Sequence, residues 1–405
     1  MTTTKNNEHK NIKVPNLRFP EFEEEWEKQK LCDISSIVGR IGFRGYTTND
    51  IVEKGMGAIA LSPTNIVNNQ LTYDKDNTYI SMSKYEESPE IMIKRGDVIF
   101  VKTGSTVGKV AYVDKMICKT TLNPQVVVLK DIKCDNYILS VIMSTRNFQN
   151  KIQRITVGGA VPTLSQVAMG NIFISLPAAK EQEKISKFIS LLDERITTQN
   201  KIIEDLKKLK SAIIEMEYSH MTKNISHIGD FIEQTSKRNK DKTIHNVLSV
   251  NNRQGFIQQS EQFENRNVAS DDTSNYKIVE KDDFAFNPAR INVGSIARLT
   301  LFERGIVSPM YICFRTRDGL LPEYLDYYFE SKPFFTEIQK RLEGSVRQCL
   351  SFDGLCNIPL CVPSVKIQRQ IGKRLSTLVQ EIKLEIDFLE LLQKQKKILL
   401  YQMFI

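Results

Sequence analysis

The feature that most constrains the fold is an internal repeat. The segment IKRGDVIFVKTGSTVGKVA, which begins at Ile93, recurs as VEKDDFAFNPARINVGSIA from Val279. Matched positions lie 186 residues apart, as from Asp97 to Asp283, and the same offset relates Gly158 to Gly344 further along. Such a period indicates two copies of one structural unit. We expect small shifts between the matched blocks, because loops of the two copies would differ in length.

Both copies follow the same plan. Short β-like runs, such as GDVIFV and PQVVVL in the first copy, are punctuated by Gly, Pro and Asn and interrupted by one helix, NYILSVIMSTRNFQNKIQ or EYLDYYFESKPFFTEIQ. A long helical segment then follows in each copy. The pattern predicts an α+β fold with five parts: a polar tail over 1–14, a mixed domain over 15–178, a helix over 179–220, a second mixed domain over 221–364 and a helix over 365–405.

The two long helices carry an apolar stripe with alternating three- and four-residue spacing. They could pack separately on their own domains, but the length of the stripe favours a coiled coil between them. A local two-fold axis would make the pair antiparallel. One such register opposes Lys210 to Glu385 and Gln199 to Lys396, whereas an equal parallel register opposes two lysines. The predicted interhelix residues are Gln199, Ile203, Leu206, Lys210, Glu385, Leu389, Leu392 and Lys396.

Composition narrows the functional classes. The 405 residues include 56 basic and 48 acidic ones, a net charge of +8 that fits a polyanionic partner. No apolar run approaches the roughly 20 residues that a bilayer needs, and the first residues do not resemble a signal peptide, so no membrane partner is expected. Seven cysteines without CxxC pairs indicate reduced thiols in the cytoplasm, and no His/Cys spacing predicts a metal site.

The catalytic motifs are incomplete. KTGSTVGKVA, from Lys102, lacks one residue of a P-loop spacing, and its counterpart PARINVGSIA keeps only the second glycine, so a tight turn between strands is expected instead. NPAR, from Asn287, lacks the second proline and the aromatic residue of an amino-methyltransferase motif. DYYFESK, from Asp326, suits a solvated helix face better than a nuclease site. We therefore predict no catalytic residues in this chain.

The repeat and three motifs resemble the specificity subunits of type I restriction–modification systems. The motifs are PNLRFPEFEEEWEKQKLCDI, KRGDVIFVKTGSTVGKVAYV, and ISLPAAKEQEKISKFISLLDERI with its weaker twin IPLCVPSVKIQRQIGKRLSTL. The resemblance implies a non-catalytic subunit with two target recognition domains, each reading half of a bipartite, asymmetric target in double-stranded DNA. The helices would set the spacer and dock two methyltransferase subunits. S-adenosylmethionine, ATP and Mg²⁺ would serve those subunits and the restriction/translocase subunits, leaving this chain without a cofactor.

Loops with polar side chains are the candidates for contact with DNA, since base edges and phosphates are met by such groups. The alternative for each is an ordinary solvent-facing loop residue. For the whole chain, the alternatives are a stand-alone DNA-modifying enzyme and a helical scaffold that binds no DNA. The candidate DNA-binding residues are Arg40, Arg44, Thr47, Lys102, Ser105, Thr106, Lys109, Asn251, Asn252, Arg253, Gln254, Asn287, Arg290 and Asn292.

Overall fold

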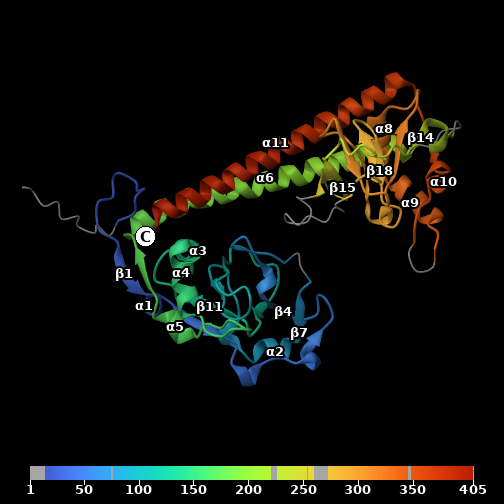
Figure 1. Ribbon diagram of the computed structural model, residues 1–405. Coiled ribbons are helices and arrows are strands. Elements are labelled where there is room, and N and C mark those ends of the chain that lie inside the picture. The colour runs from blue at the N-terminus through green and yellow to red at the C-terminus, as the bar shows by residue number, and fades with distance from the viewer. Residues whose placement is uncertain are drawn as a thin grey trace, which may run out of the picture. The chain divides into compact units, whose positions relative to one another are not determined.

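The computed structural model describes residues 14–73, 76–219, 226–252, 254–259, 272–344 and 348–404 (Figure 1). The chain divides into two compact units. Unit 1 comprises Met1–Thr198 and Leu389–Ile405, and unit 2 comprises Gln199–Phe388. Each unit therefore contains one mixed domain and part of both long helices. None of the described helices has a segment that is both long enough and apolar enough to cross a membrane.

Unit 1 is built on two sheets and a ribbon. Its main sheet has the strand order β2 (Ser36–Gly39), β11 (Val126–Lys130), β8 (Val98–Val101), β9 (Val110–Tyr112), β6 (Gln70–Leu71) and β5 (Ile66–Val67). The second sheet has the order β10 (Thr120–Leu122), β4 (Ala58–Leu61), β7 (Thr78–Ile80) and β3 (Ile51–Val52). The ribbon pairs β1 (Glu27–Lys30) with β12 (Phe173–Leu176). Strands β8 and β11 are rich in valine and isoleucine because both faces of the main sheet are largely buried.

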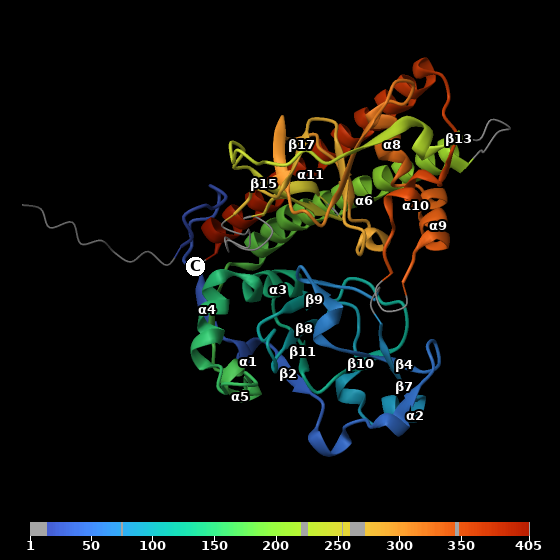
Figure 2. The ribbon, with the colours of Figure 1, turned by 45° about the vertical axis from the view of Figure 1, so that its right-hand side comes forward.

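The helices of the unit 1 domain pack beside these strands (Figure 2). They are α1 (Leu31–Ile34), α2 (Met82–Glu86), α3 (Asn136–Ser144), α4 (Arg146–Ile155) and α5 (Gln166–Gly170). The prediction of one continuous helix over α3 and α4 was wrong. Thr145 is extended, with ψ at 152°, and its hydroxyl accepts a hydrogen bond from the Phe148 amide, so it ends α3 and caps α4.

Unit 2 repeats this architecture. Its main sheet has the order β14 (Ile232–Thr235), β21 (Ile312–Thr316), β18 (Phe284–Phe286) and β19 (Ile296–Arg298), and its second sheet has the order β16 (Gly255–Gln258), β15 (Val247–Asn251), β20 (Arg304–Val307) and β17 (Lys277–Glu280). The ribbon pairs β13 (Ser226–His227) with β22 (Pro359–Leu360). Among the described residues of this domain, the helices are α8 (Pro322–Tyr328), α9 (Lys332–Arg341) and α10 (Phe352–Cys356). Short 3-10 turns are η1 (Gly42–Arg44), η2 (Thr48–Asp50), η3 (Pro63–Asn65), η4 (Pro89–Ile91), η5 (Ile228–Phe231) and η6 (Ile291–Val293).

The repeat is more regular than the sequence suggested. Strands β11 and β21, helices α4 and α9, and helices α5 and α10 all correspond at the same offset of 186 residues. The small shifts that we expected between matched blocks are absent from these elements. The copies differ before this region, where unit 1 adds the short strands β5 and β6 to the main sheet.

The long helices α6 (Ala179–Ser219) and α11 (Val365–Met403) are antiparallel, which confirms the predicted fold class. Within unit 2, contacts run from Gln199 with Glu385 to Glu217 with Arg374, so one residue number rises as the other falls. Within unit 1, Lys396 forms an ion pair with Asp193. Gln199 and Glu385 are equivalent positions of the repeat, so two equivalent residues of the helices are in contact here.

The predicted register of these helices was wrong. Lys210 does not contact Glu385. Its Nζ lies 2.6 Å from an oxygen of Glu330, which directly follows α8 and its C-cap in the unit 2 domain. Gln199 donates a hydrogen bond to the carbonyl oxygen of Glu385 at 3.1 Å instead of meeting Lys396. Of the other predicted interhelix residues, Ile203 and Leu392 are buried, while Leu206 and Leu389 are half-buried. Lys210 of α6 thus pairs with a carboxylate of the unit 2 domain. A register based on the two helices alone cannot predict such a contact.

Each domain is fixed to its helices by a shared core. In unit 1, Ile185 and Ile189 of α6 are buried with Phe100 and Phe148 of the domain, and Trp26 packs edge-on against Phe404. Burying a side chain of this size stabilises by about 1.5–3 kcal/mol. In unit 2, an aromatic cluster takes this role: it contains Tyr218, Phe284, Phe314, Tyr324, Tyr328, Phe329 and Phe334.

A buried glutamine near the start of each long helix forms side-chain hydrogen bonds with two backbone segments of the domain. We call this set of hydrogen bonds the glutamine clasp. In unit 1, the Gln182 amide accepts a hydrogen bond from the backbone N–H of Asp135 and donates one to the carbonyl of Pro177, both at 2.8 Å. In unit 2, Gln368 makes the equivalent bonds with Leu321 and Pro363 at the same distances, and a further one with Gly319. The clasp ties the helix to the segment that leads into α3 or α8.

Candidate nucleic-acid interface

The turn between β8 and β9 in unit 1 has the geometry of a tight, glycine-dependent loop. Gly104 and Gly108 have φ angles of 104° and 100°, a region that L side chains rarely adopt. A Cβ on Gly108 would lie 2.3 Å from Oε1 of Gln149, whose Nε2 donates to the Gly108 carbonyl at 2.8 Å. The expectation of a turn in which glycine is required is confirmed at this position.

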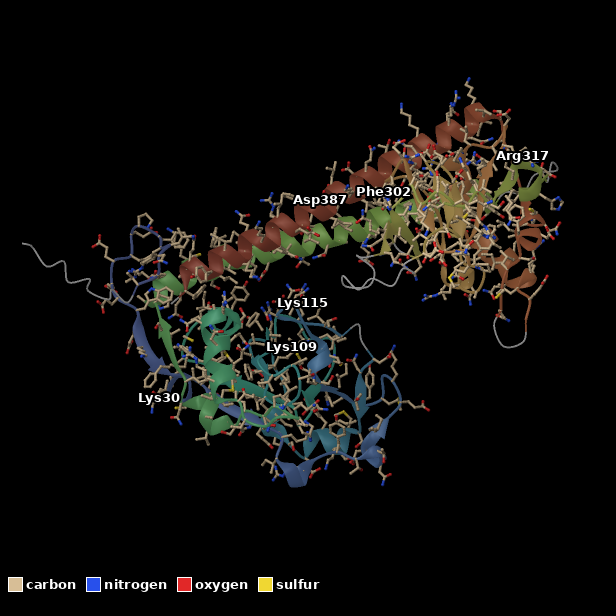
Figure 3. All side chains as sticks on the ribbon, in the orientation of Figure 1. Lys30, Lys109, Lys115, Phe302, Arg317 and Asp387 are labelled. Carbon is tan, nitrogen blue, oxygen red and sulfur yellow. The ribbon has the colours of Figure 1, made fainter. Side chains whose placement is uncertain are left out.

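This turn presents its polar side chains to solvent. Ser105 and Lys109 are exposed, and Lys102 and Thr106 are partly exposed. Lys109, labelled in Figure 3, makes one long hydrogen bond of 3.3 Å to the carbonyl of Ile66. A lysine held this weakly keeps most of its capacity to meet a phosphate or a base edge.

A second loop, which sequence reasoning missed, lies beside this turn. It is the hairpin over residues 157–163, closed by reciprocal backbone hydrogen bonds between Val157 and Thr163. The Gly104 amide donates to the Pro162 carbonyl at 2.9 Å, and the Leu164 amide donates to the Lys102 carbonyl at 2.8 Å. The repeat did contain a signal for this loop, because Gly158 matches Gly344.

The loop around Arg40 requires a correction. Arg40 is only 5% exposed, and its guanidinium donates to the Leu122 carbonyl at 2.9 Å and to the Thr121 hydroxyl at 3.1 Å. Burial lowers the pKa of this guanidinium. Arg40 therefore holds strand β10 in place and is not available to DNA in this structure. Its neighbours in the same loop are more accessible.

Arg44 and Thr47 lie at the domain surface. Arg44 donates to the carbonyl of Glu87 at 3.3 Å and lies 3.7 Å from a carboxylate oxygen of Glu90. Thr47 is exposed and precedes η2, where its amide and hydroxyl both donate to Asp50. These interactions order the loop, and the two residues stay candidates for contact with DNA.

In unit 2 the structure brings two predicted loops together. Asn251, Asn252 and Gln254 occupy the turn of the β15–β16 hairpin, while Arg290 and Asn292 occupy the turn between β18 and β19. A Cβ on Gly294 would lie 3.6 Å from the Cβ of Asn252, and the Ser295 hydroxyl donates to the Val250 carbonyl at 3.3 Å. Asn252, Gln254, Arg290 and Asn292 are all exposed, and Asn251 is partly exposed. Arg253 lies outside the described residues.

Asn287 requires the second correction. It is 8% exposed, and its side-chain oxygen accepts a hydrogen bond from the Ala289 amide at 3.1 Å, so it shapes its own turn. It does not present hydrogen-bonding groups to a partner in this structure.

The residues of the weak catalytic motif in unit 2 serve structural contacts. Asp326 pairs with Arg298 at 3.3 Å, and Glu330 pairs with Lys210. Burial raises the pKa of Asp326 to about 6. Within the described ranges, no group of three or more His, Cys, Asp or Glu side chains could hold a metal ion.

The two copies share the frame of these loops while their side chains differ. The Leu164-to-Lys102 hydrogen bond recurs as Leu350 to Pro288, at the same 186-residue offset. The 157–163 hairpin bridge recurs between Glu343 and Cys349. The structure thus contains a duplicated domain with a constant loop frame and different polar residues, and each copy is followed by a long helix.

The chain is similar to specificity subunits of type I restriction–modification systems. The sequence model of the family described as "Type I restriction modification DNA specificity domain" matches residues 23–208. The protein named "Putative type I restriction enzyme MjaX specificity subunit", from Methanocaldococcus jannaschii, is 24% identical over 93% of this chain and 92% of its own length. The MjaVIII specificity subunit of the same organism is 23% identical over 76% of this chain and 78% of its own.

Solved structures agree on the fold. The S subunit of a type I restriction–modification system from M. genitalium superposes with a TM-score of 0.58 at 15% identity, over 97% of this chain and 99% of that one. A chain from a study of complex assembly and conformational transition of a type I restriction–modification system gives a TM-score of 0.53 at 16% identity, over 94% and 97%. Residues 23–208 thus match the type I DNA specificity domain family, and the chain has the same fold as the solved type I S subunit.

Proposed function

We propose that this chain is the sequence-specific DNA-binding subunit of a type I restriction–modification complex. Each of its two domains reads one half of a bipartite, asymmetric DNA target, and the paired helices set the spacer between the half-sites. The observation that carries the proposal is the duplicated loop frame, which repeats at a constant offset while its exposed side chains change. A constant frame with different polar residues supports two recognition events of one kind on two different sequences.

The assignment of contacts follows from exposure. In unit 1, Lys102, Ser105, Thr106 and Lys109 meet DNA from one turn, with Arg44 and Thr47 on a second loop. In unit 2, Asn252, Gln254, Arg290 and Asn292 form one group across two adjacent turns, with Asn251 at its edge. The net charge of +8 favours association with the phosphate backbone.

The long helices dock two methyltransferase subunits, and restriction/translocase subunits join that complex. Support comes from apolar side chains that stay exposed at heptad spacing on single helices. Along α6, Ile202, Leu209 and Met216 are 40%, 49% and 52% exposed, and along α11, Leu391 and Ile398 are 64% and 48% exposed. Exposed apolar side chains that recur along one helix suit a partner protein.

In this proposal the chain itself is non-catalytic and cytoplasmic. S-adenosylmethionine, ATP and Mg²⁺ act in the partner subunits. The seven free thiols suit a reducing compartment.

Binding measurements distinguish the proposal from its alternatives. The purified complex with its methyltransferase should bind its target DNA with an affinity that falls steeply with salt and depends on sequence. A scaffold would bind no DNA. A stand-alone enzyme would methylate or cleave DNA without any added subunit. Sequence-independent binding to all duplexes would also contradict the proposal.

A further inference from the structure

The hairpin over residues 157–163 carries two exposed apolar side chains, one at its base and one near its tip. Val157 and Val161 are 68% and 59% exposed. The segment Thr156 to Thr163, TVGGAVPT, contains no charged side chain. Single exposed apolar residues are common, but hairpin loops are usually polar, and here a valine at the base, Val157, and a valine near the tip, Val161, are both exposed.

The tip is held rigidly. Gly158 has φ at 99°, and a Cβ there would lie 2.6 Å from the Val161 carbonyl oxygen, so only glycine allows the chain to fold back this closely. The Val157–Thr163 backbone hydrogen bonds of 3.0 and 2.7 Å close the base of the hairpin. These contacts define the backbone path of the hairpin.

The hairpin is also part of the candidate interface. Backbone contacts join it to the turn that carries Lys102 and Lys109. They are the hydrogen bonds from Gly104 to Pro162 and from Leu164 to Lys102, and the β-bridge between Thr103 and Thr163. The same frame exists in unit 2, where Glu343 bridges Cys349 and Gly344 has φ at 106°. The sequence between the bridge residues differs: it is GGAVP in the first copy and GSVRQ in the second, of which Ser345, Val346 and Arg347 lie outside the described residues.

We propose that the 157–163 hairpin reads the 5-methyl group of thymine in the half-site of unit 1, through Val157 and Val161. The inference rests on the proposed function and specifies what this loop recognises. The thymine methyl group is the apolar feature that the major groove displays, and apolar side chains are its usual contacts. The adjacent lysines supply phosphate contacts that bring the tip to the bases.

The experiment begins with the wild-type complex and a duplex that carries its methylated target. Each thymine of the unit 1 half-site is replaced in turn by deoxyuridine, which removes only the methyl group. At one or more positions the affinity should fall about fourfold, the equivalent of one buried methyl group. Equal affinity for thymine and deoxyuridine at every position, while sequence-specific binding persists, would overturn this inference and leave the proposed function intact. A half-site without an A·T pair would overturn it as well.

Variants then connect the effect to the hairpin. In V157S/V161S, which removes both methyl groups of each valine, the sensitivity to deoxyuridine should disappear while the unit 2 half-site is read as before. The matched control is V167S. Val167 is 76% exposed on α5, which packs against α1 and β2. V167S should keep the full deoxyuridine effect. Undiminished sensitivity in V157S/V161S would assign the methyl contact to another loop and overturn the inference. Loss of all sequence-specific binding by the wild-type complex would instead refute the proposed function.

Discussion

The glutamine clasp of unit 1 makes a quantitative prediction. In Gln182→Leu, the Asp135 amide and the Pro177 carbonyl lose their side-chain partner at a site where the glutamine is 8% exposed. Leaving a buried polar group without a partner costs about 1–3 kcal/mol, and this variant leaves two such groups. Packing of the leucine offsets part of the loss. The free energy of unfolding should therefore fall by about 3 kcal/mol.

The single tryptophan of the chain reports this change. Trp26 is 3% exposed in the core of unit 1, so its fluorescence follows the unfolding of that unit in urea. With a denaturant slope of about 2.5 kcal/mol per molar, the transition midpoint should fall by about 1 M. Gln182→Glu keeps the acceptor oxygen but replaces the donor with a buried charge, so it should be at least as destabilising.

Gln70→Leu is the matched control, because Gln70 is exposed on β6 of the same domain. Its midpoint should stay within the equivalent of about 0.5 kcal/mol of wild type. A shift below about 0.3 M in Gln182→Leu would refute the reasoning, since it would mean that the clasp contributes less than about 0.8 kcal/mol of net stability.

Four further predictions follow from the structure. Lys109→Ala should weaken binding to all duplexes and reduce the salt slope of log K by about one, measured by titration at several salt concentrations. Gly108→Ala, which sets a Cβ 2.3 Å from Gln149 at a φ of 100°, should destabilise unit 1 by about 1–3 kcal/mol in urea unfolding. The raised pKa of Asp326, about 6, means that the folded chain holds this proton where the unfolded chain has lost it. The protonated carboxyl of Asp326 therefore contributes fully to stability below about pH 4, and this contribution is lost as the pH rises through about 6. The free energy of unfolding of wild type, relative to that of Asp326→Asn, should fall over this pH interval. The last prediction concerns the deletion of residues 196–202 and 382–388, which are equivalent in the repeat and centred on Gln199 and Glu385. This deletion shortens each helix by about 10 Å. It should shorten the DNA spacer between the half-sites, without a change in either half-site.

The sequence predicted the domain organisation and the helix pair because each of their patterns occurs in both copies of the repeat. The offset from Asp97 to Asp283 and the long apolar stripes were sufficient for two mixed domains and an antiparallel helix pair. The register failed because charge pairing between the helices was assumed. Lys210 instead reaches Glu330 of the unit 2 domain, and such a contact depends on packing that no helix pattern contains.

The site was predicted less well for a related reason. Arg40 and Asn287 lie in glycine-, proline- or asparagine-rich segments that look like open loops, but their polar groups satisfy backbone carbonyls or amides inside the domain. Polar residue type alone does not distinguish these from Lys109 or Arg290, which remain exposed. Sequence reasoning did not select the 157–163 hairpin as a candidate loop, because valine is usually a core residue and only its exposure in the structure indicates a surface role.

The central claim is that two copies of one domain read two half-sites at a fixed separation. Methylome sequencing of a strain whose only type I specificity gene encodes this chain, together with its methyltransferase, tests it most directly. The account predicts methylated adenines in a bipartite motif whose two specific halves differ and are separated by a nonspecific gap of constant length. A continuous motif, or a gap of variable length, would contradict it.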